Sequence, residues 1–216
     1  MKKILFIPLA FIITSDVNAQ IKKGTVLLGG DVSYSTSKNS FGDVSSQKVQ
    51  SGSFGLSIGK AFKENSVFGI SLGYVANRQQ YQDIYQVDSS SYNSNIYSAG
   101  IFYRKYKQLS KSFYFFGQVD AYGFFGNDDN TQSTFFNKNK RSGGSISLSP
   151  GIAYQLCKKI QMEASIPSIF NISYATTKWT SNNPQNYPQK SSQFSVYSNL
   201  RGQSLGWFSV GFRFIL

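Results

Sequence analysis

The segment SVGFRFIL, Ser209–Leu216, alternates apolar residues with small or charged ones. In a β-strand successive side chains point to opposite faces of the sheet. The apolar residues therefore share one face: Val210, Phe212, Phe214 and Leu216. The small and charged residues share the other: Ser209, Gly211 and Arg213. The backbone of such a strand needs neighbouring strands as hydrogen-bond partners, and its apolar face needs an apolar environment. The segment therefore predicts a sheet that holds its last strand firmly.

The same alternation recurs in seven earlier segments, which with Ser209–Leu216 predict eight strands. In each segment one face carries long aliphatic and aromatic side chains, and the other carries Gly, Ser or Thr with an occasional charge. The segments are 25–35, 53–62, 67–76, 96–106, 112–125, 145–156 and 160–167.

The connections between these segments alternate in length, which predicts an up-and-down meander of hairpins. Long polar loops are expected near residues 36–50, 79–95, 126–142 and 171–203. Short turns are expected at Lys63–Ser66, Lys107–Lys111 and Cys157–Lys159. The last long loop contains two strand-like pieces, FNISYATT and QFSVYSN. They are interpreted as strand extensions beyond a membrane or, alternatively, as a ninth and a tenth strand.

The composition favours strands and argues against several function classes. Aromatic residues make up 16% of the 216 residues, and Gly is abundant. The net charge of +12 comes from cations scattered over turns and loops, so no nucleic-acid partner is expected. The chain has no histidine, which excludes Ser-His triads and most zinc sites. No metal or cofactor is expected, because Asp128 and Asp129 lack the spaced ligands of a calcium loop.

The first residues have the features of a secretory signal. Lys2 and Lys3 precede an apolar stretch from Ile4 to Ile13, and small residues precede a cut expected between Ala19 and Gln20. We therefore expect residues 1–19 to be a cleaved signal peptide and residues 20–216 to form one barrel domain.

The two faces of the strands distinguish a membrane barrel from a soluble one. A membrane barrel exposes its apolar face to lipid and closes every edge, and a narrow interior is filled by side chains. Five charged residues lie in the small-polar phase: Asp31, Arg104, Asp120, Glu163 and Arg213. We expect a salt-bridge network in the lumen, with hydrogen bonds from Gln118 and Gln161, because buried charges must pair. The alternative is a set of exposed charges on an ordinary sheet.

Aromatic side chains near the strand ends are expected to form interfacial belts on the outer surface. They are Tyr34, Phe62, Phe68, Tyr74, Tyr103, Phe113, Tyr154 and Phe214.

At its end the chain resembles the C-terminal assembly signal of bacterial outer-membrane barrels. The matching residues are Ser209, Gly211, Phe214 and Leu216, and the family pattern usually ends on Phe instead of Leu. The whole mature chain resembles the OmpA-like/OmpX-like barrel domain, often labelled "porin family protein", and its composition is similar to Bacteroidetes members. The resemblance implies a closed eight-stranded antiparallel transmembrane β-barrel in the outer membrane, exported through Sec.

The resemblance also implies the partners and the function. Expected partners are outer-membrane lipid and lipopolysaccharide, and during biogenesis periplasmic chaperones and the barrel-assembly machinery, with a monomeric product. The expected function is non-catalytic: presentation of polar surface loops for adhesion, envelope integrity or defence. The alternatives are a small-solute transport barrel and, with weaker support, a lipid-modifying enzyme.

Overall fold

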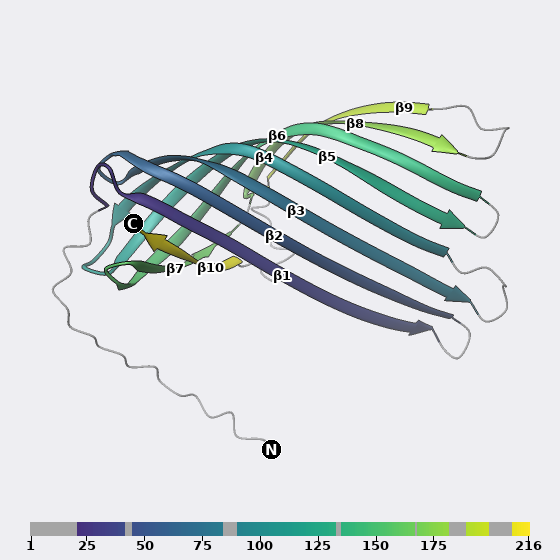
Figure 1. Cartoon of the computed structure of the whole chain (residues 1–216), viewed down its shortest axis with the longest axis horizontal. Helices are drawn as coiled ribbons and strands as arrows, with labels where there is room; N and C mark the ends of the chain where they lie inside the picture. The colour runs from purple at the N-terminus through teal and green to yellow at the C-terminus, as the bar shows by residue number, and fades with distance from the viewer. Residues whose placement is uncertain are drawn as a thin grey trace, which may run out of the picture.

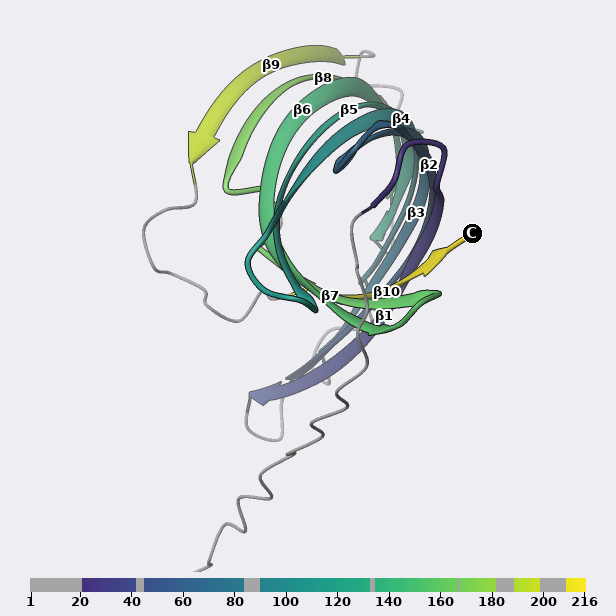
Figure 2. The ribbon, with the colours of Figure 1, turned by 90° about the vertical axis from the view of Figure 1, so that its left-hand side faces the viewer.

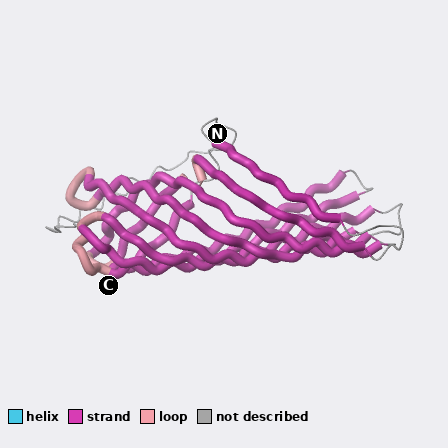
Figure 3. Tube along the Cα trace, turned by 90° about the horizontal axis from the view of Figure 1, so that it is seen from above, coloured by secondary structure: helices cyan, strands magenta, loops and turns pink. Residues whose placement is uncertain are grey.

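The computed structural model describes residues 21–41, 45–83, 90–132, 135–166, 168–181, 189–198 and 209–216. Its described elements are strands joined by turns (Figures 1 and 3). The strands are β1 Val26–Phe41, β2 Ser45–Lys63, β3 Ser66–Asp83, β4 Ser90–Gln108, β5 Phe113–Gln132, β6 Phe135–Cys157, β7 Ile160–Ser165, β8 Phe170–Ser181, β9 Gln189–Ser198 and β10 Ser209–Ile215. In these ranges no helix is long and apolar enough to cross a membrane. The expected signal peptide, residues 1–19, lies outside the described residues.

Within the described chain, eight of these strands close into an antiparallel ring. Strands β1 to β7 pair in sequence order, β10 pairs with β7, and β1 pairs with β10 from Leu27 to Gly30. Figure 2 shows this ring viewed roughly along the barrel axis. The predicted closed barrel, with its last strand held between its first strand and β7, is confirmed.

Strands β8 and β9 lengthen the barrel wall without widening the ring. The part of β6 near the short turns, Gly151–Cys157, pairs with β7. Residues 137–148 of the same strand pair with β8, and β8 in turn pairs with β9. The two pieces interpreted from the sequence as strand extensions beyond a membrane form β8 and β9, which extend the wall at its outer end. Their placement beyond the membrane is wrong, because the exposed apolar belt of the wall continues onto them at Tyr174, Phe194 and Val196. Beyond Gly30, toward the end of the barrel opposite the short turns, β1 pairs with β2 alone among the described residues. Residues 31–40 are exposed.

The predicted loops are too long, because much of each predicted loop belongs to the paired strands. Strands β1 and β2 pair as far as Phe41 and Ser45, and the β3–β4 and β5–β6 hairpins are similarly long. These outer ladders are rich in Ser, Asn and Gln on both faces, so they lack the apolar alternation that marks a half-buried strand. Their backbone groups nevertheless pair across each hairpin. The three short turns are confirmed, and Asn65 in the β2–β3 turn has a φ of 56°, as a tight hairpin requires.

The outward face of the wall carries an exposed apolar belt. Ile70 and Leu72 on β3 are 54% and 56% exposed, and Phe212 on β10 is 53% exposed. On β5 the belt runs from Phe113 to Phe125, about 40 Å along the strand, or about 28 Å along the axis at a 45° tilt. Aromatic pairs border the belt. The ring centroids of Phe113 and Tyr154 lie 4.7 Å apart near the short turns, and those of Tyr97 and Phe125 lie 5.4 Å apart toward the opposite end of the barrel.

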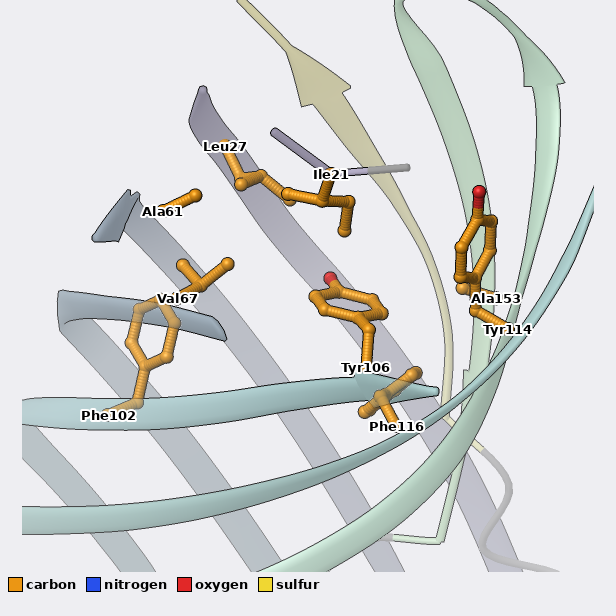
Figure 4. Packing of buried hydrophobic residues seen from close by; sticks show 9 residues of the cluster. All are labelled: Ile21, Leu27, Ala61, Val67, Phe102, Tyr106, Tyr114, Phe116 and Ala153. Carbon is orange, nitrogen blue, oxygen red and sulfur yellow. The ribbon is translucent and has the colours of Figure 1, made fainter. Parts of the chain in front are cut away.

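The inner end of the lumen is filled by an apolar cluster, which we call the plug (Figure 4). Its members are Ile21, Leu27, Ala61, Val67, Phe102, Tyr106, Tyr114, Phe116 and Ala153. The sequence predicted small residues and paired charges inside the lumen, and the structure adds this apolar cluster to them. Ile21 precedes β1 and folds back over the barrel end, where its carbonyl accepts a 3.0 Å hydrogen bond from the Asn65 amide.

Glycines on neighbouring strands make room for the large rings of the plug. Phe102 on β4 lies against Gly59 and Gly69, where an added Cβ would come within 2.8 Å and 2.6 Å of the ring. Gly151 on β6 similarly makes room for Phe116. The dense packing of these rings, with Phe102 and Phe116 2% and 1% exposed, means that removing one leaves a cavity.

We expect Phe102→Ala to lower the free energy of unfolding by about 3–5 kcal/mol, because transfer and cavity terms add. Phe68→Ala, on the outward face of the adjacent strand and 49% exposed, is the matched control. Its loss should be smaller, since surrounding solvent or lipid fills the vacated space. Urea unfolding of the folded protein in vesicles measures both. Equal losses for the two variants would show that Phe102 is not packed inside.

Candidate functional site: the charged lumen above the plug

Three charged side chains from three strands meet in the lumen. Arg104 on β4 reaches across to Glu163 on β7, with 2.5 Å between Nη1 and Oε1. Arg213 on the adjacent β10 approaches the same carboxylate, with Nε 2.9 Å from Oε1 and Nη2 3.3 Å from Oε2. All three residues are buried, being 5%, 9% and 6% exposed in the order named. The carboxylate thus sits between two guanidinium groups and ties opposite sides of the barrel together.

Further polar groups surround this ion-pair triad, which is Arg104, Glu163 and Arg213. Arg104 Nε donates to Gln118 Oε1 at 2.6 Å, and Gln118 Nε2 donates to Asp120 Oδ1 at 2.6 Å. Arg104 Nη1 also donates to the hydroxyl of Tyr106 at 3.0 Å, and the guanidinium lies 4.1 Å from the ring centroid of Phe116. The triad is therefore anchored to the plug by hydrogen bonding and by a cation–π contact.

The backbone of the neighbouring strands leaves space for these large groups. Gly29 on β1 lies beneath Arg213, and an added Cβ there would lie 2.9 Å from Cζ of the guanidinium. Ser57 on β2 receives a long hydrogen bond of 3.4 Å from Arg213 Nη1. A side chain larger than hydrogen at position 29 would therefore push Arg213 away from Glu163.

A cavity of about 270 Å³, lined by both polar and apolar side chains, borders the triad, and Phe116 of the plug also lines it. Charged side chains that line it include Asp31, Asp120 and the triad, and hydroxyls that line it include Ser71 and Ser149. The cavity is large enough for several waters or a small solute. The cavity thus lies between the plug residue Phe116 and the polar residues Asp31, Ser71 and Ser149.

The five charged residues predicted for the lumen are not all joined. The structure brings Arg104, Glu163 and Arg213 into direct contact and links Asp120 to them through Gln118. Asp31 lies apart: it points to the same side of the wall, over Gly55, but is exposed and forms no ion pair within the described residues. It follows the last residue pair between β1 and β10, where the wall no longer covers it.

The two glutamines expected to support the network behave differently from each other. Gln118 joins it, as described above, but Gln161 donates instead to Gln155 Oε1 at 2.9 Å, nearer the turn between β6 and β7. In the described ranges, no group of three or more Cys, Asp or Glu side chains is placed to hold a metal ion.

Sequence reasoning missed the aromatic partners of the site. Tyr106 and Phe116 occupy the same strand phase as Arg104 and Gln118, so their inward direction was available from the period of two. They were overlooked because large rings were associated with the lipid-facing side alone.

The residues that resemble an assembly signal lie on both faces of β10. Ser209 and Gly211 are in the inward phase, whereas Phe214 and Leu216 point outward and are 47% and 71% exposed. Leu216 exchanges backbone hydrogen bonds with Val26 at the closing seam. Recognition of this segment by an assembly machinery stays a prediction.

Comparison with known proteins shows the fold and no family. No protein-family model matches the chain, and no curated protein sequence matches it. The outer membrane protein OprG from Pseudomonas aeruginosa superposes with a TM-score of 0.52 at 13% identity, covering 90% of this chain and 97% of OprG. The chain therefore has the fold of an outer-membrane β-barrel.

Two further structures superpose more loosely. The ferric yersiniabactin uptake receptor FyuA from Yersinia pestis has a TM-score of 0.44 at 6% identity, covering 81% of this chain and 31% of FyuA. The outer membrane protease OmpT from Escherichia coli has a TM-score of 0.42 at 8% identity, covering 91% of this chain and 94% of OmpT. We draw nothing about this chain from these two.

Neutralising the shared carboxylate tests the triad. We expect Glu163→Gln to lower the free energy of unfolding by about 3–5 kcal/mol, because two buried arginines then lose the carboxylate that bridges them. Asp31→Asn removes the same charge at an exposed position and should change stability by less than about 0.5 kcal/mol. Thermal unfolding in detergent, followed by circular dichroism, measures both. Equal stability of the two variants would contradict the structural role of the triad.

Proposed function

We propose that the protein is an integral protein of the bacterial outer membrane that presents polar hairpins at the cell surface and has no catalytic role. The observation that carries this proposal is that side chains fill the lumen, which would seal it. The plug fills its inner end, and the triad of Arg104, Glu163 and Arg213 spans it immediately above. A barrel closed in this way acts as a rigid anchor for what it carries outside.

The outer surface supports the membrane location. The exposed apolar belt, about 28 Å tall on β5, is close to the apolar band of about 25 Å typical of outer-membrane barrels. Beyond Phe125 the outward positions on β5 are Asn127 and Asp129, so the surface becomes polar where the belt ends. We keep export through Sec, assembly by periplasmic chaperones and the barrel machinery, a monomeric state, and kinship with Bacteroidetes OmpA-like/OmpX-like barrels as parts of the proposal.

The long hairpins are the feature that reaches beyond the membrane. Strands β1 and β2 continue seven residues past the row of Tyr34 (about 23 Å along the strands), and their outer parts are rich in Ser, Asn and Gln. Adhesion, envelope integrity and defence are the roles that such a rigid polar surface supports.

A catalytic role is disfavoured by the state of the lumen carboxylates. Both oxygens of Glu163 are held by arginines, and an oxygen of Asp120 accepts a hydrogen bond from Gln118. The two arginines stabilise Glu163 as a structural anion. We therefore rank a lipid-modifying enzyme last.

The second candidate function is transport of a small solute, and the cavity that borders the triad is the observation that favours it. Its lining by Ser71, Ser149 and Asp120 would suit a hydrated molecule. A solute would have to displace the plug to cross, so we place this function second.

The membrane location is tested by a charge placed at two depths on one face of β3. We expect Ile70→Lys, in the middle of the apolar belt, to destabilise the vesicle-inserted protein by about 2–4 kcal/mol. Gln82→Lys lies on the same face beyond the belt and should have an effect near zero. Urea unfolding in lipid vesicles measures both. If the two lysines had equal effects, the belt would not face lipid.

The sealed lumen is tested by electrical recording. We expect folded protein in planar bilayers to show no steady, sizeable conductance steps, since plug and triad together block the path. An open porin recorded in the same membrane serves as the positive control. Steady steps from the wild-type chain would overturn the anchor role in favour of transport.

A further inference from the structure

The outward face of β6, β8 and β9 is layered in a regular order. These strands lie side by side at the outer end of the barrel (Figure 2), and their registers align outward-facing residues in rows of three. The rows are given in order along the barrel axis, away from the short turns. The first is the aliphatic row, Ile146, Ile172 and Val196, and the second is the aromatic row, which consists of Tyr174 and Phe194 beside Gly144. The hydroxyl row is Ser142, Thr176 and Ser192, and the lysine row is Lys140, Lys178 and Lys190.

The lysine row is electrostatically unfavourable by itself. Lys140 faces Lys178 directly across one strand pair, and Lys178 faces Lys190 across the next. Directly opposed residues have Cβ atoms about 4.5–5.5 Å apart, and like charges in that arrangement destabilise a sheet. All three side chains are exposed. An anion bound between them would remove the repulsion.

The neighbourhood supplies few negative charges to the row. The described residues of β8 and β9 include no Asp or Glu. On the other side of β6, Asp129 lies opposite Lys138, one row further out, and Asn127 lies opposite Lys140. No carboxylate of the described strands therefore lies in the lysine row itself, and an anion bound there would come from outside this part of the chain.

The layers below place the lysine row at the level of lipid headgroups. Tyr174 and Phe194 are 53% and 67% exposed and suit the membrane interface. The lysine row lies four residues further out, about 13 Å along the strands and about 9 Å along the barrel axis at a 45° tilt. That depth falls in the headgroup layer, where flexible lysine side chains reach phosphates.

A similar order on the far side of the wall supports this depth. On β1 and β2, an apolar pair, Val32 with Phe54, is followed outward by Tyr34, and Lys38 with Lys48 lies two rows beyond Tyr34. Two parts of the barrel that are distant along the sheet thus change from apolar to aromatic to cationic at the same spacing. The layering therefore follows the surroundings of the barrel.

From these observations we propose that Lys140, Lys178 and Lys190 bind the phosphate of a lipopolysaccharide-type glycolipid, whose acyl chains lie against the aromatic and aliphatic rows. The proposal rests on the membrane location proposed above and adds a site and its ligand. Hydrocarbon contact directly beneath the cations distinguishes this ligand from free phosphate, which would use the lysines alone. The row would fix one lipid on the outer wall beneath the longest hairpins.

The test uses the full-length barrel with Lys140→Gln, Lys178→Gln and Lys190→Gln combined. The matched control combines Lys60→Gln, Lys105→Gln and Lys107→Gln, three exposed lysines near the short turns at the other end of the wall. Barrels folded in uncharged detergent are titrated with lipid A, with dephosphorylated lipid A of the same acyl composition, and with inorganic phosphate. Bound lipid is counted by native mass spectrometry.

We expect the triple variant of the lysine row to bind lipid A at least tenfold more weakly than wild type and the control variant to bind it as wild type does. Dephosphorylated lipid A should bind wild type as weakly as lipid A binds the lysine-row variant. Equal lipid A affinity in wild type and the lysine-row variant would overturn the proposal. Competition by inorganic phosphate at concentrations equal to those of lipid A would also overturn it, by showing a free-anion site.

Insertion into vesicles, monitored by migration of unboiled protein on gels, separates this outcome from failure of the proposed function. If wild type inserts and the lysine-row variant still binds lipid A normally, the lipid site alone is wrong. If wild type does not insert, the membrane location is wrong, and the lipid site falls with it.

Discussion

Backbone hydrogen bonding is the constraint on which the rest of this structure depends. A wall surrounded by lipid offers no solvent partner for N–H and C=O groups, so each strand must be paired on both edges across the apolar belt. The pairing of β1 with β10 meets this requirement in the part of the seam near the short turns, with Leu27–Gly30 paired in register and Leu216 bonded to Val26. Closure by eight strands then determines how narrow the lumen is, and the narrow lumen determines what fills it.

The filling of the lumen depends on matching large side chains with absent ones. Phe102 lies against Gly59 and Gly69, and Arg213 lies over Gly29. Glycine in a strand normally weakens it, but here it makes room for the groups that span the barrel. The plug and the triad support each other, because Tyr106 and Phe116 contact the Arg104 guanidinium that binds Glu163. Apolar packing and ion pairing are thus one unit in this lumen.

The outside of the barrel is organised by depth instead of by strand. Aliphatic, aromatic, hydroxyl and cationic rows follow one another outward on β6, β8 and β9, although these residues are far apart in the sequence. The long hairpins continue past this gradient on ladders whose two faces are both polar. The same strands therefore serve as membrane wall and as surface structure.

The sequence by itself determined the strand class, the inward and outward phase of each membrane segment, and the set of charges available to the lumen, because a period of two assigns faces without knowledge of partners. It also located the three short turns. The tertiary structure decided the length of the hairpins, since polar ladders in water carry no periodic signal, and the contents of the plug, since Phe102 needs glycines on two other strands. It also decided which charges meet. Arg104 and Glu163 are brought together by the stagger of strands around a closed ring, and Asp31 is left apart because the seam opens at Gly30, neither of which is local along the chain.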